Sequence, residues 1–286
     1  MDHVAYFAGG QSFSADLIER LPVDPPDAPF FRGINETWRP LQDAFATPGW
    51  LEHSRAVARR AVPSPLLKAA YRRLFRGGDV PNYLAMPLRL TRRKLAQRCT
   101  ARILDFGGGF GENYALIRRE LGGAVKWSIV DNRCAANLSN ELYGGRFPDL
   151  HFAEEIGGTH DLALLIGSLQ YVKDWRNLLA KIAAHGLPDI YIARTPIRID
   201  GPSFLTTQDI CPPLGRWGGR KVGEANVWVL GRNDMARTMA ALGYRLAEER
   251  FNQSRSHDYA HLPTSHRNVA YLFSHWVPVH ADSPCA

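Results

Sequence analysis

The sequence predicts an α/β fold: a doubly wound, mostly parallel, seven-stranded sheet with an N-terminal helical extension. Three observations lead to this prediction. An apolar stretch at 103–106 runs directly into a glycine-rich turn, which is followed by a helical pattern. Strand-like and helix-like patterns alternate between residues 99 and 195, as parallel strands joined by helices require. Two strand-like stretches, 244–251 and 269–276, close the chain and predict a final strand pair.

The N-terminal third has a different pattern. Residues 1–30 are polar and carry four prolines, which predicts a loosely ordered arm. From 35 to 98 the apolar residues recur mostly at helical spacing, with prolines interrupting. We therefore divide the chain into an N-terminal arm with a helical extension, 1–98, and a main domain, 99–286.

The main domain is predicted element by element. Expected strands are 103–106, 127–130, 150–156, 162–169 and 189–193, and expected helices are 114–121, 135–142 and 175–185. After Pro196, residues 197–226 are rich in proline and glycine, which predicts a long loop insertion that covers a site or is disordered. A helix at 233–242 then precedes the last two strands, with Asn233 as a candidate cap and Gly243 as its stop.

The glycine-rich turn, 107–111, is the most informative feature for function. Glycine lets the backbone approach a nucleotide-like ligand, because no Cβ holds that ligand away. A dinucleotide fingerprint needs glycines at offsets 0, 2 and 5, whereas this turn has them at 0, 2 and 4, with Glu112 at offset 5. A carboxylate in the first helical turn repels a diphosphate. Asp105 and Glu112 therefore favour a cationic nucleoside over NAD(P).

These residues resemble motif I of the Rossmann-like, class I methyltransferases, in which a strand leads into Asp-x-Gly-x-Gly-x-Gly. The pieces that follow are similar in order: a second strand ending in an acid for the ribose, a third ending in an acid near the adenine, and a fourth with its turn at 161–174. The resemblance implies S-adenosylmethionine as the cofactor of an enzyme that transfers its methyl group. It implies cofactor contacts at Asp105, Gly107, Gly109, Gly111, Asp131, Glu154 (or Glu155) and Gly167.

More narrowly, the chain is similar to a group of bacterial methyltransferases often associated with surface-polysaccharide gene clusters. The resemblance covers roughly residues 30–275 and rests on 106–108, 169–171, 194–196, 206–208, Gly33 and Trp38. It implies that the N-terminal helices hold the substrate. It also implies a small-molecule or carbohydrate-like acceptor, methylated at oxygen, and a role in polysaccharide biosynthesis.

Methyl transfer requires alignment of the acceptor more than a fixed catalytic residue. Together with Gln170, the candidates for facing the acceptor are Tyr171, Asp174 and Arg194. Tyr171 is expected either to orient the acceptor or to pack on the next helix. Arg194 is expected either to clamp a substrate carboxylate or phosphate, or to pair with Asp174 or Asp209.

Bulk properties limit the alternatives. Between 51 and 102 there are 13 basic residues against 2 acids, within an overall net charge of +7, which indicates either a solvated helical face or a surface for an anionic partner. His257, His261 and His266 lack the setting of a metal site, so no metal is expected. We find no apolar run long enough to span a membrane, no leader and no nucleic-acid module, and we expect the cytoplasm.

Three rival functions follow from these features. They are an NAD(P)-dependent oxidoreductase on a similar fold, a non-catalytic interaction protein with a methyltransferase-like fold, and an RNA methyltransferase, which the sequence pI of about 9.4 favours. A homodimer and an anionic acceptor are left open.

Overall fold

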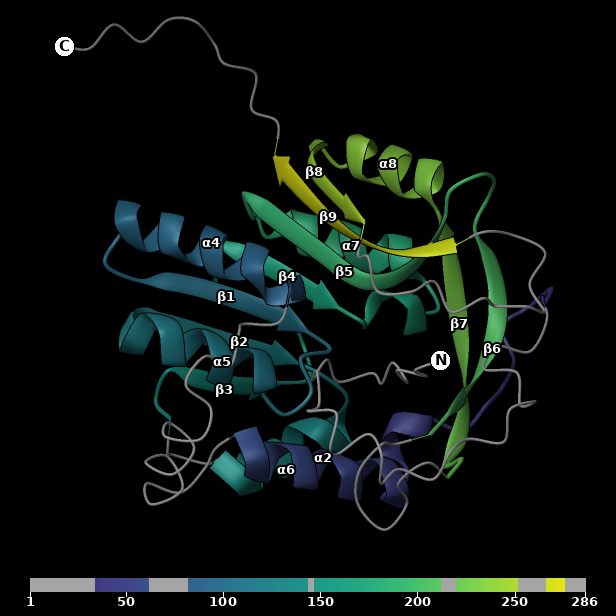
Figure 1. Cartoon of the computed structure of the whole chain (residues 1–286), viewed down its shortest axis with the longest axis horizontal. Helices are drawn as coiled ribbons and strands as arrows, with labels where there is room; N and C mark the ends of the chain where they lie inside the picture. The colour runs from purple at the N-terminus through teal and green to yellow at the C-terminus, as the bar shows by residue number, and fades with distance from the viewer. Residues whose placement is uncertain (1–33, 62–81, 144–146, 212–219, 252–265, 276–286) are drawn as a thin grey trace, which may run out of the picture.

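A computed structural model describes residues 34–61, 82–143, 147–211, 220–251 and 266–275. Nine strands form one sheet, with the order β3-β2-β1-β4-β5-β7-β6, and β9 joins β5 to β8 (Figure 1). The strands are β1 (Ala101–Phe106), β2 (Val125–Val130), β3 (Leu150–Ala153), β4 (Leu162–Ile166), β5 (Asp189–Arg198), β6 (Phe204–Ile210), β7 (Gly223–Gly231), β8 (Tyr244–Phe251) and β9 (His266–His275). Strands β1 to β5 are parallel to their neighbours among themselves, which confirms the mostly parallel α/β sheet.

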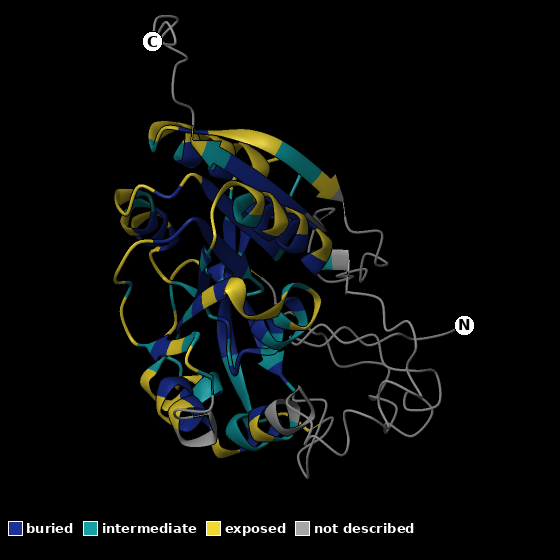
Figure 2. Ribbon diagram, turned by 90° about the vertical axis from the view of Figure 1, so that its left-hand side faces the viewer, coloured by how far each residue is buried: buried dark blue, intermediate teal, exposed yellow. Residues whose placement is uncertain are grey.

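Helices cover both faces of this sheet. One core contains side chains from α4 (Asn82–Gln97), α5 (Glu112–Leu121) and α6 (Arg133–Tyr143), and the other contains side chains from α7 (Trp175–Ala184) and α8 (Arg232–Ala241). Neighbouring residues of β4 face opposite cores: Leu164 lies in the first and Leu165 in the second. Because both faces are buried, the central strands are almost continuously apolar. Figure 2 shows these buried strands between helices whose outer surfaces are exposed.

The predicted count of seven strands is wrong, and so is the predicted loop at 197–226. Strand β5 continues to Arg198, and β6 and β7 form an antiparallel hairpin from this region. The prolines and glycines misled the prediction because the stretches 204–210 and 224–230 contain none of them and are rich in β-branched and aromatic residues. Strand β7 pairs with β5 only at Ile197 and Arg198, so the hairpin extends the sheet beyond the carboxyl end of β4.

The remaining elements lie close to their predicted positions. Helix α8 is preceded by Gly231 as its cap, not by Asn233 as expected, so that helix begins at Arg232. Strand β3 ends at Ala153, before the expected Ile156. The predicted arm at 1–30, the histidines 257 and 261, and residues 62–81 lie outside the described residues.

The first described stretch of the N-terminal region, 34–50, packs beside the β6–β7 hairpin. This stretch contains η1 (Ala44–Ala46) and the start of α2 (Pro48–Ala61), and α2 continues against α5. Asn35 forms a β-bridge with Leu205 of β6, and Ala44 packs against Ile210 and Ala225. The chain thus brings its N-terminal segment to the edge of the sheet at which the parallel strands end.

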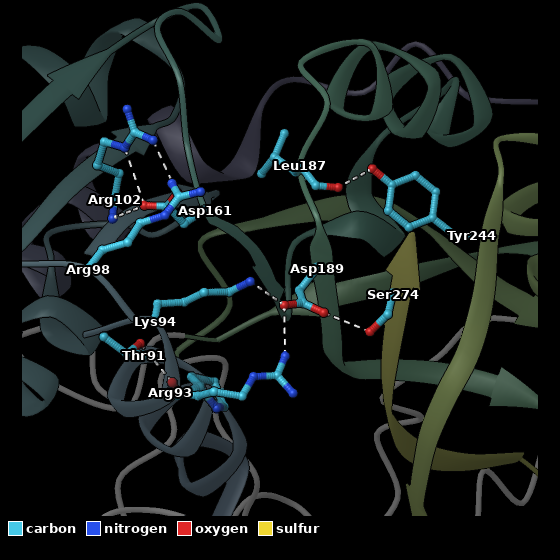
Figure 3. A network of polar contacts seen from close by, with 11 residues as sticks. Thr91, Arg93, Lys94, Arg98, Arg102, Asp161, Leu187, Asp189, Tyr244 and Ser274 are labelled. Atoms are coloured by element: carbon cyan, nitrogen blue, oxygen red, sulfur yellow. Dashed lines mark hydrogen bonds and ion pairs between the residues drawn. The ribbon is translucent and has the colours of Figure 1, made fainter. Parts of the chain in front are cut away.

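Ion pairs attach helix α4 to the amino-terminal end of β5, which is the opposite end of the parallel strands (Figure 3). The buried carboxylate of Asp189 forms ion pairs with Lys94 at 2.8 Å and Arg93 at 3.1 Å, and it accepts a hydrogen bond from the hydroxyl of Ser274 at 2.7 Å. Basic residues of the 51–102 segment that pair with acids of the main domain are Arg89, Arg93, Lys94, Arg98 and Arg102. These five side chains form ion pairs within the chain, and a role of the 51–102 segment toward an anionic partner stays a prediction. None of the described helices is long and apolar enough to cross a bilayer.

Candidate functional site

The glycine-rich turn between β1 and α5 is held close to its neighbours. The N–H of Gly107 donates to the carbonyl of Val130 at 2.8 Å, which ties the turn to β2. Gly107, Gly109 and Gly111 have φ angles of 67°, 58° and 82°, in the left-handed region that favours glycine. A Cβ at Gly107 would lie 2.3 Å from Cβ of Ser168, so the turn also passes against the end of β4. The conformation of this turn therefore depends on glycine.

Asp105, at the end of β1, is fully buried beneath this turn. Its Oδ2 accepts hydrogen bonds from the indole N–H of Trp127 at 3.2 Å and from the amide of Asn113 at 3.3 Å. Its Oδ1 has no hydrogen-bond partner among the described residues. Burial raises the pKa of Asp105 to about 7. A buried carboxyl group with an unused oxygen is suited to a ligand that donates an N–H or carries positive charge.

Two more acids lie beside Asp105. Asp131, at the end of β2, accepts the N–H of Gly109 at 3.0 Å and that of Asn132 at 2.7 Å, and burial raises its pKa. Glu112, at the start of α5, has a pKa raised to about 7, first by burial and then by the charges of Asp105 and Asp131. Three carboxyl groups therefore surround one turn and repel one another. The charge of Arg194 acts in the opposite direction on Glu112.

Arg194 comes from an irregular position in β5. Its φ of 56° is the only positive φ at a non-glycine residue in the described part of the chain. The pairing of β5 with β9 shifts register between Ile192 and Thr195, which is the signature of a β-bulge. The guanidinium Cζ of Arg194 lies 5.2 Å from the ring centroid of Tyr83 in α4. The bulge therefore brings a cation to the edge that carries the three acids.

Tyr171 lies on the side of the site formed by the hairpin. Its hydroxyl donates to Oε1 of Gln208 in β6 at 2.9 Å, and its ring makes an edge contact with Phe45, with centroids 4.8 Å apart. Phe45 in turn contacts Trp50, with centroids 5.0 Å apart. Burial raises the pKa of Tyr171 to about 12, so the phenol stays neutral near pH 7. It can orient a ligand by hydrogen bonding, but it cannot act as a base at that pH.

The structure gives two predicted site residues other partners. Asp174 is exposed and caps α7, where its carboxylate accepts the N–H of Asn177 at 3.1 Å. Glu154 is exposed after β3 and pairs with Arg133 at 3.3 Å. Asp209 pairs with Lys221 at 2.9 Å, and the expected pairing of Arg194 with Asp174 or Asp209 stays a prediction. Within the described ranges, no group of three or more potential metal ligands occurs.

Several residues of the site did not come from the sequence analysis. Asn113 and Trp127 bind Asp105, and Tyr83 contacts Arg194. Asn113 could have been found, because it stands four residues before the buried Ile117 and so falls on the inner face of α5. Tyr83 gave no such signal, since its approach to β5 depends on how α4 packs.

Comparisons with known proteins give matches only among solved structures: no protein-family model and no curated protein matches the sequence. An S-adenosylmethionine-dependent methyltransferase from Clostridium acetobutylicum is 11% identical, with a TM-score of 0.47, over 74% of this chain and 98% of that one. A 1,6-didemethyltoxoflavin-N1-methyltransferase from Burkholderia thailandensis is 16% identical, with a TM-score of 0.46, over 86% of this chain and 95% of that one. CalS10, an amino pentose methyltransferase from Micromonospora echinaspora, is 15% identical, with a TM-score of 0.43, over 75% and 98%. At these identities a function has to be argued from the chain's own residues.

Proposed function

We propose that this protein is a methyltransferase that uses S-adenosylmethionine. The observation that carries the proposal is the set of three acids around the glycine-rich turn: Asp105, which is buried, and Glu112 and Asp131, which are half-buried. Carboxylates held close together with little access to water repel one another, and a bound cation lowers that cost. S-adenosylmethionine carries an ammonium and a sulfonium against one carboxylate. The diphosphate of NAD(P) would instead meet the carboxylate of Glu112 at the start of α5, where a phosphate needs free N–H groups.

The residues present fit this donor. Asp105 offers a buried, unused carboxylate oxygen to an ammonium group. Asp131 can accept hydrogen bonds from ribose hydroxyls, since each of its oxygens has one backbone N–H partner, from Gly109 or Asn132, and keeps a second lone pair. The predicted contacts of Gly109, Gly111 and Gly167 use backbone, and that of Glu154 with the adenine stays a prediction. When bound, the donor supplies an electrophilic methyl group on positive sulfur.

For the acceptor, we propose a small molecule or a carbohydrate-like compound, methylated at oxygen. Support comes from the resemblance to polysaccharide-associated methyltransferases and from the aromatic residues Phe45, Trp50 and Tyr171 beside the site. Aromatic rings pack against the apolar faces of sugars and other rings. Tyr171 would orient the acceptor as a neutral hydrogen-bonding group. We also propose the cytoplasm as the site of action, where the donor is made.

Calorimetry tests the donor. We expect S-adenosylhomocysteine to bind the wild-type protein and NAD to give no heat. Asp105→Ala and Gly109→Val should abolish that binding, because the first removes the ammonium partner and the second puts a β-branched residue at a positive φ. Asp200→Ala, at an exposed turn, is the matched control and should bind normally.

Tight binding of NAD, together with no measurable binding of S-adenosylhomocysteine, would overturn the proposal in favour of the oxidoreductase. Transfer of a labelled methyl group into a fractionated cell extract then identifies the acceptor. Binding without transfer into any fraction would support the non-catalytic alternative.

A further inference from the structure

The backbone at Arg194 is strained, and the strain has a specific support. A left-handed φ is unfavourable for a residue with a Cβ, so surrounding contacts have to impose it. The amide of Gln170 donates to the carbonyl of Arg194 at 3.4 Å, and the hydroxyl of Thr195 donates to Oε1 of Gln170 at 3.3 Å. Gln170 and Thr195 are both buried. One side chain in the turn after β4 thus holds both residues of the bulge.

The bulge lies beside the carboxyl end of β4, and the charge of Arg194 acts on Glu112 at the start of α5. Gly167 ends β4 in a left-handed conformation, and its N–H donates to the carbonyl of Ala193 at 2.8 Å. A Cβ at Gly167 would lie 3.8 Å from Cβ of Arg194, so the arginine side chain starts directly beside the carboxyl end of β4. Its charge partly offsets the rise that burial causes in the pKa of Glu112 and of Tyr83. Arg194 and Asp105 therefore lie on the two strands that flank β4, β5 and β1, and the charge of Arg194 influences the acids near the carboxyl ends of these strands.

We propose that Arg194 binds the carboxylate of the donor's amino-acid end and that Gln170 is the residue that positions it; this proposal rests on the proposed function. The amino-acid end is a zwitterion, with an ammonium and a carboxylate on one carbon. The site offers a matching pair of charges: the buried Asp105 at the end of β1, and Arg194 at the bulge of β5. The planar guanidinium can bind a carboxylate with two parallel hydrogen bonds, which rewards fixed orientation. This assignment places Arg194 at the donor and not, as the sequence suggested, at the acceptor.

Two ligands that differ only in the amino-acid end test the proposal by calorimetry. S-adenosylhomocysteine carries the zwitterion, and 5′-methylthioadenosine keeps the nucleoside and sulfur without it. Arg194→Met should weaken binding of S-adenosylhomocysteine by roughly 10- to 100-fold, the range for a lost hydrogen bond to a charged group, and should leave methylthioadenosine within about twofold. Arg194→Lys should recover only part of the loss.

Gln170→Met tests the positioning role. It should weaken S-adenosylhomocysteine but not methylthioadenosine, and the double variant with Arg194→Met should be no weaker than Arg194→Met alone, because both changes remove one interaction. Arg198→Met is the matched control: it lies on the same strand, with its guanidinium bonded to the carbonyls of Asp200 and Pro202, and should bind both ligands normally. Thermal unfolding of each variant checks that it is folded.

The outcomes separate this proposal from the proposed function. Equal affinity of Arg194→Met and wild type for S-adenosylhomocysteine would overturn the role of Arg194 while leaving the donor assignment intact. Loss of methyl transfer with unchanged donor affinity would likewise overturn it and place Arg194 at the acceptor. Failure of the wild-type protein to bind either nucleoside would overturn both proposals.

Discussion

Replacement of Asp105 by asparagine should make the protein more stable at alkaline pH and a weaker binder of its donor. Burial raises the pKa of this carboxyl group to about 7, from about 4 in an unfolded chain. The folded state then holds the proton more tightly than the unfolded state. Wild-type stability contributed by this group is therefore fully present below about pH 4 and falls as the pH rises to about 7.

The magnitude follows from the size of the shift. Three pKa units correspond to about 4 kcal/mol at pH 8, and about 2 to 3 kcal/mol of that accumulates between pH 5 and pH 8. Asparagine does not ionise, so the variant does not lose this stability as the pH rises. Its amide keeps an oxygen for Trp127 and Asn113, but the NH2 then takes the position of Oδ1, which costs about 1 to 3 kcal/mol for an unsatisfied buried donor. The net gain at pH 8 is about 1 to 3 kcal/mol.

Urea unfolding of the ligand-free protein at pH 5 and pH 8 measures this effect. The stability difference between Asp105→Asn and wild type should grow by about 2 to 3 kcal/mol across that range, at unchanged m-value. In the same samples, affinity for S-adenosylhomocysteine should fall at least about tenfold at pH 8. Asp200→Asn, on the surface, should show a difference within about 0.5 kcal/mol at both pH values. A difference for Asp105→Asn that is independent of pH would refute the reasoning.

Three further predictions concern packing and polar contacts. Gly108→Ala should cost about 1 to 3 kcal/mol and weaken donor binding, because its Cβ would lie 2.5 Å from Cγ of the buried acid below; Gly123→Ala, which meets no atom within 4 Å, should cost less than about 0.5 kcal/mol in urea unfolding. Tyr171→Phe should cost about 1 to 3 kcal/mol by removing the donor to Gln208, and the pH–rate profile from pH 6 to 9 should keep its shape, since a pKa of about 12 leaves the phenol neutral; a lost limb in that range would contradict this. Asp189→Asn should cost about 1 to 3 kcal/mol, because it removes the charge of the buried carboxylate that pairs with Arg93 and Lys94. Donor affinity by calorimetry should be unchanged, because Asp189 lies at the amino end of β5, away from the glycine-rich turn; weakened binding would contradict this.

The parts of the site that could be predicted are those with a local cause. The turn from Asp105 to Glu112 is fixed by the order of strand, glycines and helix, and Asp131 follows from the next strand. The capping role of Asp174 is also local, because an acid directly before a helix accepts an N–H from its first turn. That signal competed with the resemblance to the family and was passed over.

The parts that could not be predicted depend on tertiary contacts. An arginine at a positive φ is disfavoured by its own Cβ, so nothing at Arg194 indicates the bulge until Gln170 and the partner strand β9 are in place. The β6–β7 hairpin was missed because proline and glycine content outweighed the β-branched residues between them. Its pairing with β5 through only Ile197 and Arg198 leaves no periodic signal in the sequence.

The N-terminal segment that packs beside the hairpin has a consequence for how the protein is made. Asn35 bonds Thr207 across 172 residues of sequence, and the backbone of Arg39 exchanges hydrogen bonds with the amide of Asn226 across 187. At synthesis rates of roughly 5 to 20 residues per second, this segment emerges about 10 to 40 seconds before its partner strands exist. The ribosome thus releases one side of the binding region early and supplies the other side late. Assembly of that region therefore comes after most of the central sheet has been translated, and a newly made chain cannot bind its ligands before then.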